Sequence, residues 1–306
     1  MNSKMTKIVA AFCTATLLIF STGTATAGGL LEVSFDPTNF SNGMVIDNPY
    51  WPLLPYGVMS RTFTYIGETD DECVIDVISA NAGDIKILHG DDNPVYAGFM
   101  AQVILDREWV VEDCDTVPTE DDLAELTYDW YAQDDFGNIW YLGEASRDFG
   151  DDCPSLMEVM PGADDWRDFS EFQEDCTEGS WEAGQFGPDG EIIGRAGIVV
   201  PSDYPTGPTG DKLSAGTYYM QEVAEGAEDV AKILKTNASV SIEDGQFTGH
   251  YEDCRKVKEW TALEPGGSVE HKYYCPGIDG PGGLVLINGL TGGPTESEIL
   301  IEMTSN

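Results

Sequence analysis

Apolar and polar residues alternate over short stretches along most of the chain. Strand-like runs cover residues 61–67, 73–78, 85–88 and 95–111, and the last of these carries apolar residues at every second position. Breaks rich in Gly, Asp, Asn and Pro separate the runs at intervals of about ten residues. This pattern predicts a mainly β protein that folds as a single antiparallel β-meander.

The clearest strand–turn–strand signal lies between Glu125 and Glu144. Two aromatic-rich runs flank the polar break Asp134–Asn138, whose Gly and Asn tolerate the positive φ of a tight turn. We therefore expect an antiparallel hairpin whose large aromatic side chains pair across the two strands. These side chains are Tyr128, Trp130, Trp140 and Tyr141.

One segment, 225–235, departs from the strand pattern. Its apolar residues fall at the i, i+3, i+4 and i+7 positions of an amphipathic helix, with acids near the start and lysines near the end. The sequence therefore predicts one short helix there. Further strands are expected at 238–242, 246–260, 269–275, 284–288 and 299–303.

Residues 39–57 are rich in proline and aromatic residues. Pro49, Pro52 and Pro55 forbid a regular helix and make a central strand improbable. We interpret this stretch as an extended lead-in that lies across one end of the sheet.

The hairpin also carries a resemblance to other proteins. DWYAQD at 129–134, GNIWY at 137–141 and GSWEAG at 179–184, with further motifs between residues 48 and 288, resemble a family of secreted bacterial proteins of unassigned function. The resemblance implies an exported, β-rich single domain. It carries over no catalytic or ligand-binding residues.

Residues 1–27 have the features of a signal peptide. A basic region with Lys4 and Lys7 precedes an apolar core from Ile8 to Phe20, and small residues follow. The core is too short to span a membrane and no later stretch is apolar enough, so we expect no transmembrane segment. Residues 28–306 are expected to form one exported domain, extracellular or periplasmic.

The charge balance narrows the choice of partners. The net charge is −40, and loss of the signal peptide removes two lysines and no acids, which leaves −42. Such a surface argues against nucleic acid and against anionic membranes, because both present phosphates. Solubility in a salty setting and cation binding are both open explanations of the acidity.

Six cysteines remain after the signal peptide, and an even number in an exported chain indicates three disulfides. Sequence alone does not fix their connectivity. Spacing suggests the local pairs Cys153–Cys176 and Cys254–Cys275, which leaves Cys73–Cys114 as the third.

His271 lies on an expected strand. Alternation places His271 and Tyr273 on one face of that strand. The other face carries Glu270, Lys272 and Tyr274. A structural histidine and a copper or catalytic histidine are both open, with Gln221, Glu222 or a main-chain carbonyl as candidate partners.

Acidic turns are the best candidates for site chemistry. Several turns place two acids on one bend, two of them with an asparagine as well, and hard oxygen ligands on a loop suit Ca²⁺. The preferred ligands are Asp134, Asp135 and Asn138, with Asp91 and Asp92 second. The alternative is that these are ordinary solvated turn residues.

No nucleophile elbow, zinc-protease motif or phosphate-binding loop occurs in the chain. We therefore favour a non-catalytic binding or surface-associated protein with an extracellular ligand or cell-surface polymer. The alternative is a hydrolase that attacks an extracellular polymer through paired carboxylates, which cannot be located among 55 acids. A concave cleft with two nearby carboxyl groups would favour the hydrolase, and a convex surface would favour binding.

Overall fold

The computed structural model describes most of the chain beyond the expected signal peptide. The described residues are 28–68, 72–90, 93–149, 153, 176, 179–187, 189–243, 245–263, 269–276, 283–291 and 297–306. Two of the expected calcium ligands, Asp91 and Asp92, lie outside this set.

The fold is mainly β, as the sequence predicts. The strands are β1 (Ser60–Glu68), β2 (Cys73–Ile87), β3 (Met100–Val111), β4 (Leu123–Gln133), β5 (Ile139–Asp148), β6 (Trp181–Glu182), β7 (Gly194–Arg195), β8 (Gly197–Val200), β9 (Tyr218–Met220), β10 (Val223–Ala224), β11 (Asp229–Ile242), β12 (Gly249–Thr261), β13 (Val269–Cys275), β14 (Gly283–Thr291) and β15 (Glu298–Ser305). The helical elements in the described residues are two short 3-10 turns, η1 (Pro37–Asn39) and η3 (Glu120–Asp122).

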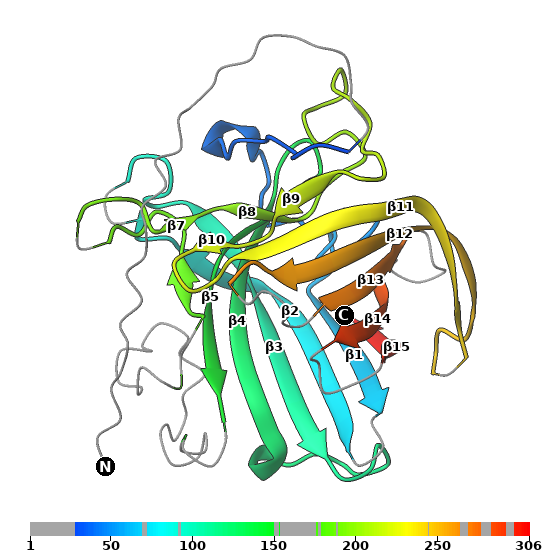
Figure 1. The fold of residues 1–306 in the computed structure, drawn as a ribbon. Coiled ribbons are helices and arrows are strands. Elements are labelled where there is room, and N and C mark those ends of the chain that lie inside the picture. Colours follow the sequence, from blue (N-terminus) through cyan, green and yellow to red (C-terminus); the bar gives the residue numbers. More distant parts are fainter. Residues whose placement is uncertain are drawn as a thin grey trace, which may run out of the picture.

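Thirteen of these strands form one antiparallel sheet. Its order follows the chain backwards from β6 and β5 to β1, then continues through β15, β14, β13, β12 and β11 to β9. The thirteenth strand, β8, lies off this path and pairs with β5. Because β1 pairs with both β2 and β15, it joins an N-terminal meander to a C-terminal one. The sheet bends between the two meanders, so that β11 and β12 run across the direction of β3–β5 (Figure 1).

Strand alternation gives this curved sheet two different faces. On β3, Asp106 points to the concave inner face, whereas Leu105 and Arg107 point to the outer face. Across the bend, β13 sends Lys272 and Tyr274 to the same inner face. The concave face therefore collects polar side chains from both meanders.

The hairpin expected between Glu125 and Glu144 is confirmed as β4 and β5. The Asp134 amide donates to the Asn138 carbonyl at 3.0 Å, and Gly137 takes the positive φ of 88° that its turn requires. Tyr131 lies opposite Tyr141, with ring centroids 4.8 Å apart. The hairpin is therefore confirmed, but the expected pairing among its four aromatic residues is not: Tyr128 lies opposite Ala145 and Trp140 opposite Ala132, and Tyr131 supplies the aromatic partner of Tyr141.

The prediction of a helix at 225–235 is wrong. The segment forms the start of β11, which pairs with β9 on one side and β12 on the other. Val230, Ala231 and Ile233 are buried there, and the β-branched side chains suit a pleated strand. Apolar residues then alternate with serines up to Ile242, so the buried face repeats every second residue, which is the spacing of a strand.

The disulfide pairing suggested by spacing is confirmed. Cys73–Cys114, Cys153–Cys176 and Cys254–Cys275 are all bonded. The third joins the neighbouring strands β12 and β13. Such bonds are typical of proteins that fold in an oxidising compartment.

The proline-rich lead-in packs against the sheet. An isolated bridge joins Ile46 to Leu54, and Trp51 is buried with its ring centroid 5.8 Å from that of Tyr131 and 6.2 Å from that of Tyr274. Trp51 therefore touches strands of both meanders. Within the described ranges, no helix is long and apolar enough to cross a membrane.

Candidate functional site

A cavity of about 230 Å³ lies on the concave face, between the two meanders. Its wall combines side chains from strands β2–β5 with side chains from β11–β14. Eight of the lining residues carry carboxyl groups: Asp76, Asp106, Glu125, Asp129, Glu144, Glu222, Asp229 and Glu259. A smaller cavity of about 70 Å³ adjoins it and adds Glu108.

The strand register sets several of these acids directly opposite one another. Glu108 lies opposite Asp76 on one side and Glu125 on the other, and Asp129 lies opposite Glu144. Like charges in direct cross-strand positions destabilise a sheet. The fold therefore holds an arrangement that costs stability unless protons or a cation neutralise it.

Tyr141 connects two of the acids. Its hydroxyl contacts Asp129 Oδ1 and Glu144 Oε2, the latter at 2.6 Å. A hydroxyl has one proton to donate, so one of the two contacts requires a protonated carboxyl group. Desolvation and the facing charge of Glu144 raise the pKa of Asp129 well above its ordinary value, in agreement with a shared proton.

Asp76 and Asp106 form a second carboxyl pair, joined by a hydrogen bond. A hydrogen bond between two carboxyl groups also requires a proton. Desolvation, followed by the charge of Asp106, raises the pKa of Asp76 well above its usual range. Its Oδ1 atom is buried and has no hydrogen-bond partner.

Two further acids hold protons into the neutral range. Desolvation, then the charges of Asp229 and Asp129, raises the pKa of Glu222 to about 8. Desolvation, then Glu125, raises the pKa of Glu108 to about 7. Perturbed carboxyl groups concentrated in one cavity are typical of functional sites.

Lys272 is the one cation among the lining residues. Its Nζ lies 2.8 Å from Glu259 and 3.7 Å from Glu270. Desolvation opposes the charge on the ammonium, but Glu259 and Glu270 outweigh it and raise the pKa of Lys272. One ammonium neutralises only a small part of the carboxyl charge around the cavity.

Aromatic side chains make up much of the remaining wall. Trp51, Tyr131, Tyr141 and Tyr274 all line the cavity. Aromatic rings attract cations through their quadrupoles. The wall therefore offers a cation two kinds of neighbouring group, carboxyl groups and aromatic rings.

The expected calcium ligand Asp134 is buried in the β4–β5 turn. Its Oδ1 accepts hydrogen bonds from the amides of Phe136 and Asn138, and its Oδ2 accepts from Asn138 Nδ2 and Trp140 Nε1, all within 3.0 Å. The structure gives this carboxylate a turn-forming role.

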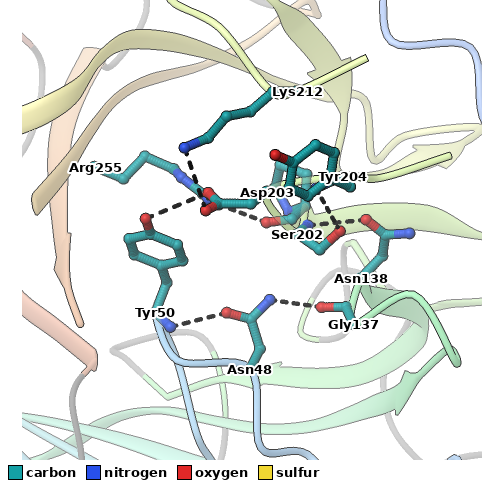
Figure 2. A network of polar contacts seen from close by, with 10 residues as sticks. Asn48, Tyr50, Gly137, Asn138, Ser202, Asp203, Tyr204, Lys212 and Arg255 are labelled. Atoms are coloured by element: carbon teal, nitrogen blue, oxygen red, sulfur yellow. Dashed lines mark hydrogen bonds and ion pairs between the residues drawn. The ribbon is translucent and has the colours of Figure 1, made fainter. Parts of the chain in front are cut away.

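Asn138 and Gly137 of the same turn contact other segments (Figure 2). Asn138 Oδ1 accepts from the Ser202 amide at 2.9 Å, and Asn48 Nδ2 donates to the Gly137 carbonyl at 2.6 Å. Asp135 accepts from the amide and hydroxyl of Ser41. These turn residues lie apart from the cavity lining, and calcium binding by them stays a prediction.

Across the described ranges, no three His, Cys, Asp or Glu side chains are grouped so as to hold a metal ion. This holds for the cavity acids as well as for the turn. The charge of the cavity is thus spread over its wall rather than focused on one point.

His271 faces away from the cavity, as the expected strand alternation requires. Gln221 and Glu222 line the cavity together with Lys272, so their suggested pairing with His271 is wrong. Desolvation, then Lys256 and Lys258, lowers the pKa of His271.

Sequence reasoning missed the cavity acids. Their signal was present as acids on one face of a strand, such as Asp106 and Glu108 two residues apart, or Glu125 and Asp129 four residues apart. An acid at a position whose neighbours along the strand are buried is informative, because charged residues are rarely placed there without a role. In a chain with 55 acids this signal did not stand out.

Comparison with known proteins yields little. No family model and no curated protein matches the chain. A solved structure from Bacteroides fragilis, described as an exported protein with a YmcC-like fold, aligns over 82% of this chain and 97% of its own at 10% identity, with a TM-score of 0.29. A TM-score this low supports no conclusion about fold or function, and the resemblance to a secreted family stays a prediction.

Proposed function

We propose that this protein is an exported binding protein that takes a small organic cation, such as an amine, into its acidic cavity. The main evidence for the proposal is the composition of the cavity wall. Eight carboxyl groups and four aromatic side chains surround about 230 Å³ of space, with Lys272 as the one cation lining it.

Repulsion among the carboxyl groups of the cavity makes the binding of a cation favourable. Without one, the acids can lower their mutual repulsion only by keeping protons, as the raised pKa values of Glu222 and Glu108 indicate. A cation would stabilise the ionised carboxylates and release those protons. Binding and proton release are therefore coupled.

An organic cation fits better than a bare metal ion. The cavity has room for roughly eight water molecules at about 30 Å³ each, which exceeds the volume of an ion. Ring faces such as those of Trp51 and Tyr131 suit ammonium groups, whereas Ca²⁺ requires six or more converging oxygens.

Thermal unfolding tests the proposal. The mature protein would be heated at about pH 8 with a short aliphatic diamine, tetramethylammonium, Ca²⁺ or Na⁺ at matched ionic strength. We expect one of the organic cations to raise the midpoint by a few degrees, since a ligand at about 100 times its Kd adds about 2.7 kcal/mol. Equal shifts for all four would show screening alone and overturn the proposal.

A pair of variants locates the effect. Glu222→Gln removes a cavity carboxyl group, and Glu302→Gln removes an exposed one from β15. The organic cation should stabilise the first variant less than the wild type and the second equally. If both variants respond alike, the ligand does not bind in the cavity.

A hydrolase is the second candidate. The concave site with neighbouring carboxyl groups meets the expectation for one, but two catalytic acids would leave the other six acids of the wall without a role. Glu259 forms an ion pair with Lys272 at 2.8 Å, while the raised pKa of Glu222, about 8, keeps that carboxyl group protonated in the neutral range. An ionised and a protonated carboxyl group are what polymer hydrolysis requires. Release of reducing ends or peptides that Glu259→Gln abolishes would favour the hydrolase over the binding protein.

A further inference from the structure

The outer face of β11–β13 carries a concentration of positive charge. Lys232 lies directly opposite Lys258, and Lys258 lies opposite His271. In the next row, Lys235 lies opposite Lys256. We call this set the lysine face.

This concentration is unusual for the composition of the chain. The protein has 15 lysines and arginines against 55 acids, yet four lysines share one face of the two neighbouring strands β11 and β12. Alternation along β12 sends Val257 and Glu259 to the buried and cavity side, so Lys256 and Lys258 point outward.

Without a bound partner, the lysine face lowers the stability of the folded protein. Like charges directly opposite each other destabilise a sheet, and no carboxylate of the described residues forms an ion pair with any of the four lysines. The Lys256 and Lys258 ammonium groups instead lie over the rings of Tyr273 and Trp260, at 5.0 and 5.1 Å. Desolvation, then these two ammonium groups, lowers the pKa of His271.

Two features of the protein indicate which class of partner fits the lysine face. The face presents lysines rather than arginines, and lysine acts as a point charge without the bidentate geometry that suits phosphate. The rest of the molecule is strongly negative, so a densely charged polymer such as nucleic acid, or an anionic membrane, is repelled beyond the edge of the face. A polymer with fewer charges along its length suffers less repulsion.

We propose that the lysine face binds an acidic polysaccharide through its sugar carboxylates. Neighbouring strands are about 5 Å apart and outward residues of one strand about 7 Å apart, so the lysines form a grid close to the length of one sugar ring. The disulfides indicate an oxidising compartment, where polymers of this kind are encountered. This interaction is independent of cation binding in the cavity.

The test measures binding to polygalacturonate against its methyl-esterified form, which keeps the sugar chain and removes the charge. We expect saturable binding to polygalacturonate that weakens as salt is added, and none to the ester. Absence of binding to polygalacturonate at low salt would overturn the proposal. So would stronger binding to duplex DNA or to phosphatidylglycerol vesicles than to polygalacturonate.

Matched variants locate the interaction. The double variant Lys256→Gln with Lys258→Gln removes two charges from the lysine face, and Lys212→Gln with Arg195→Gln removes two from elsewhere on the surface. We expect the first to lower affinity at least about tenfold and the second to leave it within about twofold. Equal losses in both would contradict the proposal. The first variant should fold, because it relieves repulsion, and its thermal midpoint checks this.

Discussion

Lys272 on β13 and Glu259 on β12 form an ion pair across neighbouring strands, with Nζ and Oε2 2.8 Å apart. Tyr274 adds a hydroxyl contact to the other oxygen of Glu259 at 3.4 Å. The pair lies on the wall of the acidic cavity and places one ammonium group among its carboxyl groups. Among the other lining acids, the pKa values of Asp76, Asp129, Glu144 and Glu222 are raised by desolvation and by neighbouring carboxyl groups.

Replacement of Lys272 tests this pair. Lys272→Met leaves Glu259 as a buried carboxylate without its cation, so the free energy of unfolding should fall by about 3 kcal/mol. Lys212→Met, which breaks an exposed pair with Asp203 at 3.7 Å, should cost less than about 1 kcal/mol. Adding Glu259→Gln to Lys272→Met should restore part of the loss. Equal costs for the two lysine variants in urea unfolding would refute this role.

The stability of the protein should decrease from weakly acidic to weakly basic pH. Glu222 and Glu108 have folded pKa values of about 8 and about 7, above the ordinary 4.5, so the folded state keeps protons that the unfolded state releases. The contribution of these two groups to the free energy of unfolding is thus complete below about pH 4.5. It is lost as the pH rises to about 8, by about 1.4 kcal/mol per pH unit for each proton that only the folded state retains.

Urea unfolding at a series of pH values measures this slope. The double variant Glu222→Gln with Glu108→Gln should have a flatter slope than the wild type, because two titrating groups are gone. Greater wild-type stability at pH 8 than at pH 5 would show that the acids are not held protonated.

Tyr141 should matter through its hydroxyl alone. Tyr141→Phe keeps the ring packed against Tyr131 but removes the group that Asp129 and Glu144 share. Leaving buried polar groups without a partner costs about 1–3 kcal/mol. Tyr56→Phe, at a side chain that is 84% exposed, is the control and should be neutral. A Tyr141→Phe variant as stable as this control would remove the shared-proton interpretation.

The calcium prediction at the hairpin turn is tested separately. Asp134 is already used by four donors, so Asp135 is the residue to change. We expect Ca²⁺ to raise the thermal midpoint more than Na⁺ at matched ionic strength, and Asp135→Asn to reduce that difference. If the two ions act alike on the wild type, no calcium site exists at the turn.

Much of the fold could be predicted from local patterns. The β4–β5 hairpin follows from its aromatic runs and the Asp134–Asn138 turn, and the three disulfides follow from cysteine spacing. The start of β11 could not be predicted, because Ala227, Val230, Ala231 and Leu234 fit a helical period over one short stretch. Pairing with β9 and β12 decides its structure, and those partners lie outside any local window.

The site was harder to predict than the fold. Asp76, Asp129 and Glu259 are far apart in sequence and meet only because β1 and β15 join the two meanders into one curved sheet. The register that sets Glu108 opposite both Asp76 and Glu125 is a long-range property. Sequence analysis instead selected acids at turns, where Asp134 proves to stabilise the bend.

The most direct test of cation binding in the cavity counts protons. Titration calorimetry of the mature protein with a short aliphatic diamine, at about pH 7 in two buffers of different ionisation enthalpy, gives both the affinity and the protons released. The diol of the same length is the uncharged control. We predict saturable binding of the diamine with release of about one proton, a smaller release from Glu222→Gln, and no binding of the diol. The proposed function would be contradicted if the diamine gave no saturable binding heat, or if it bound without any net release of protons.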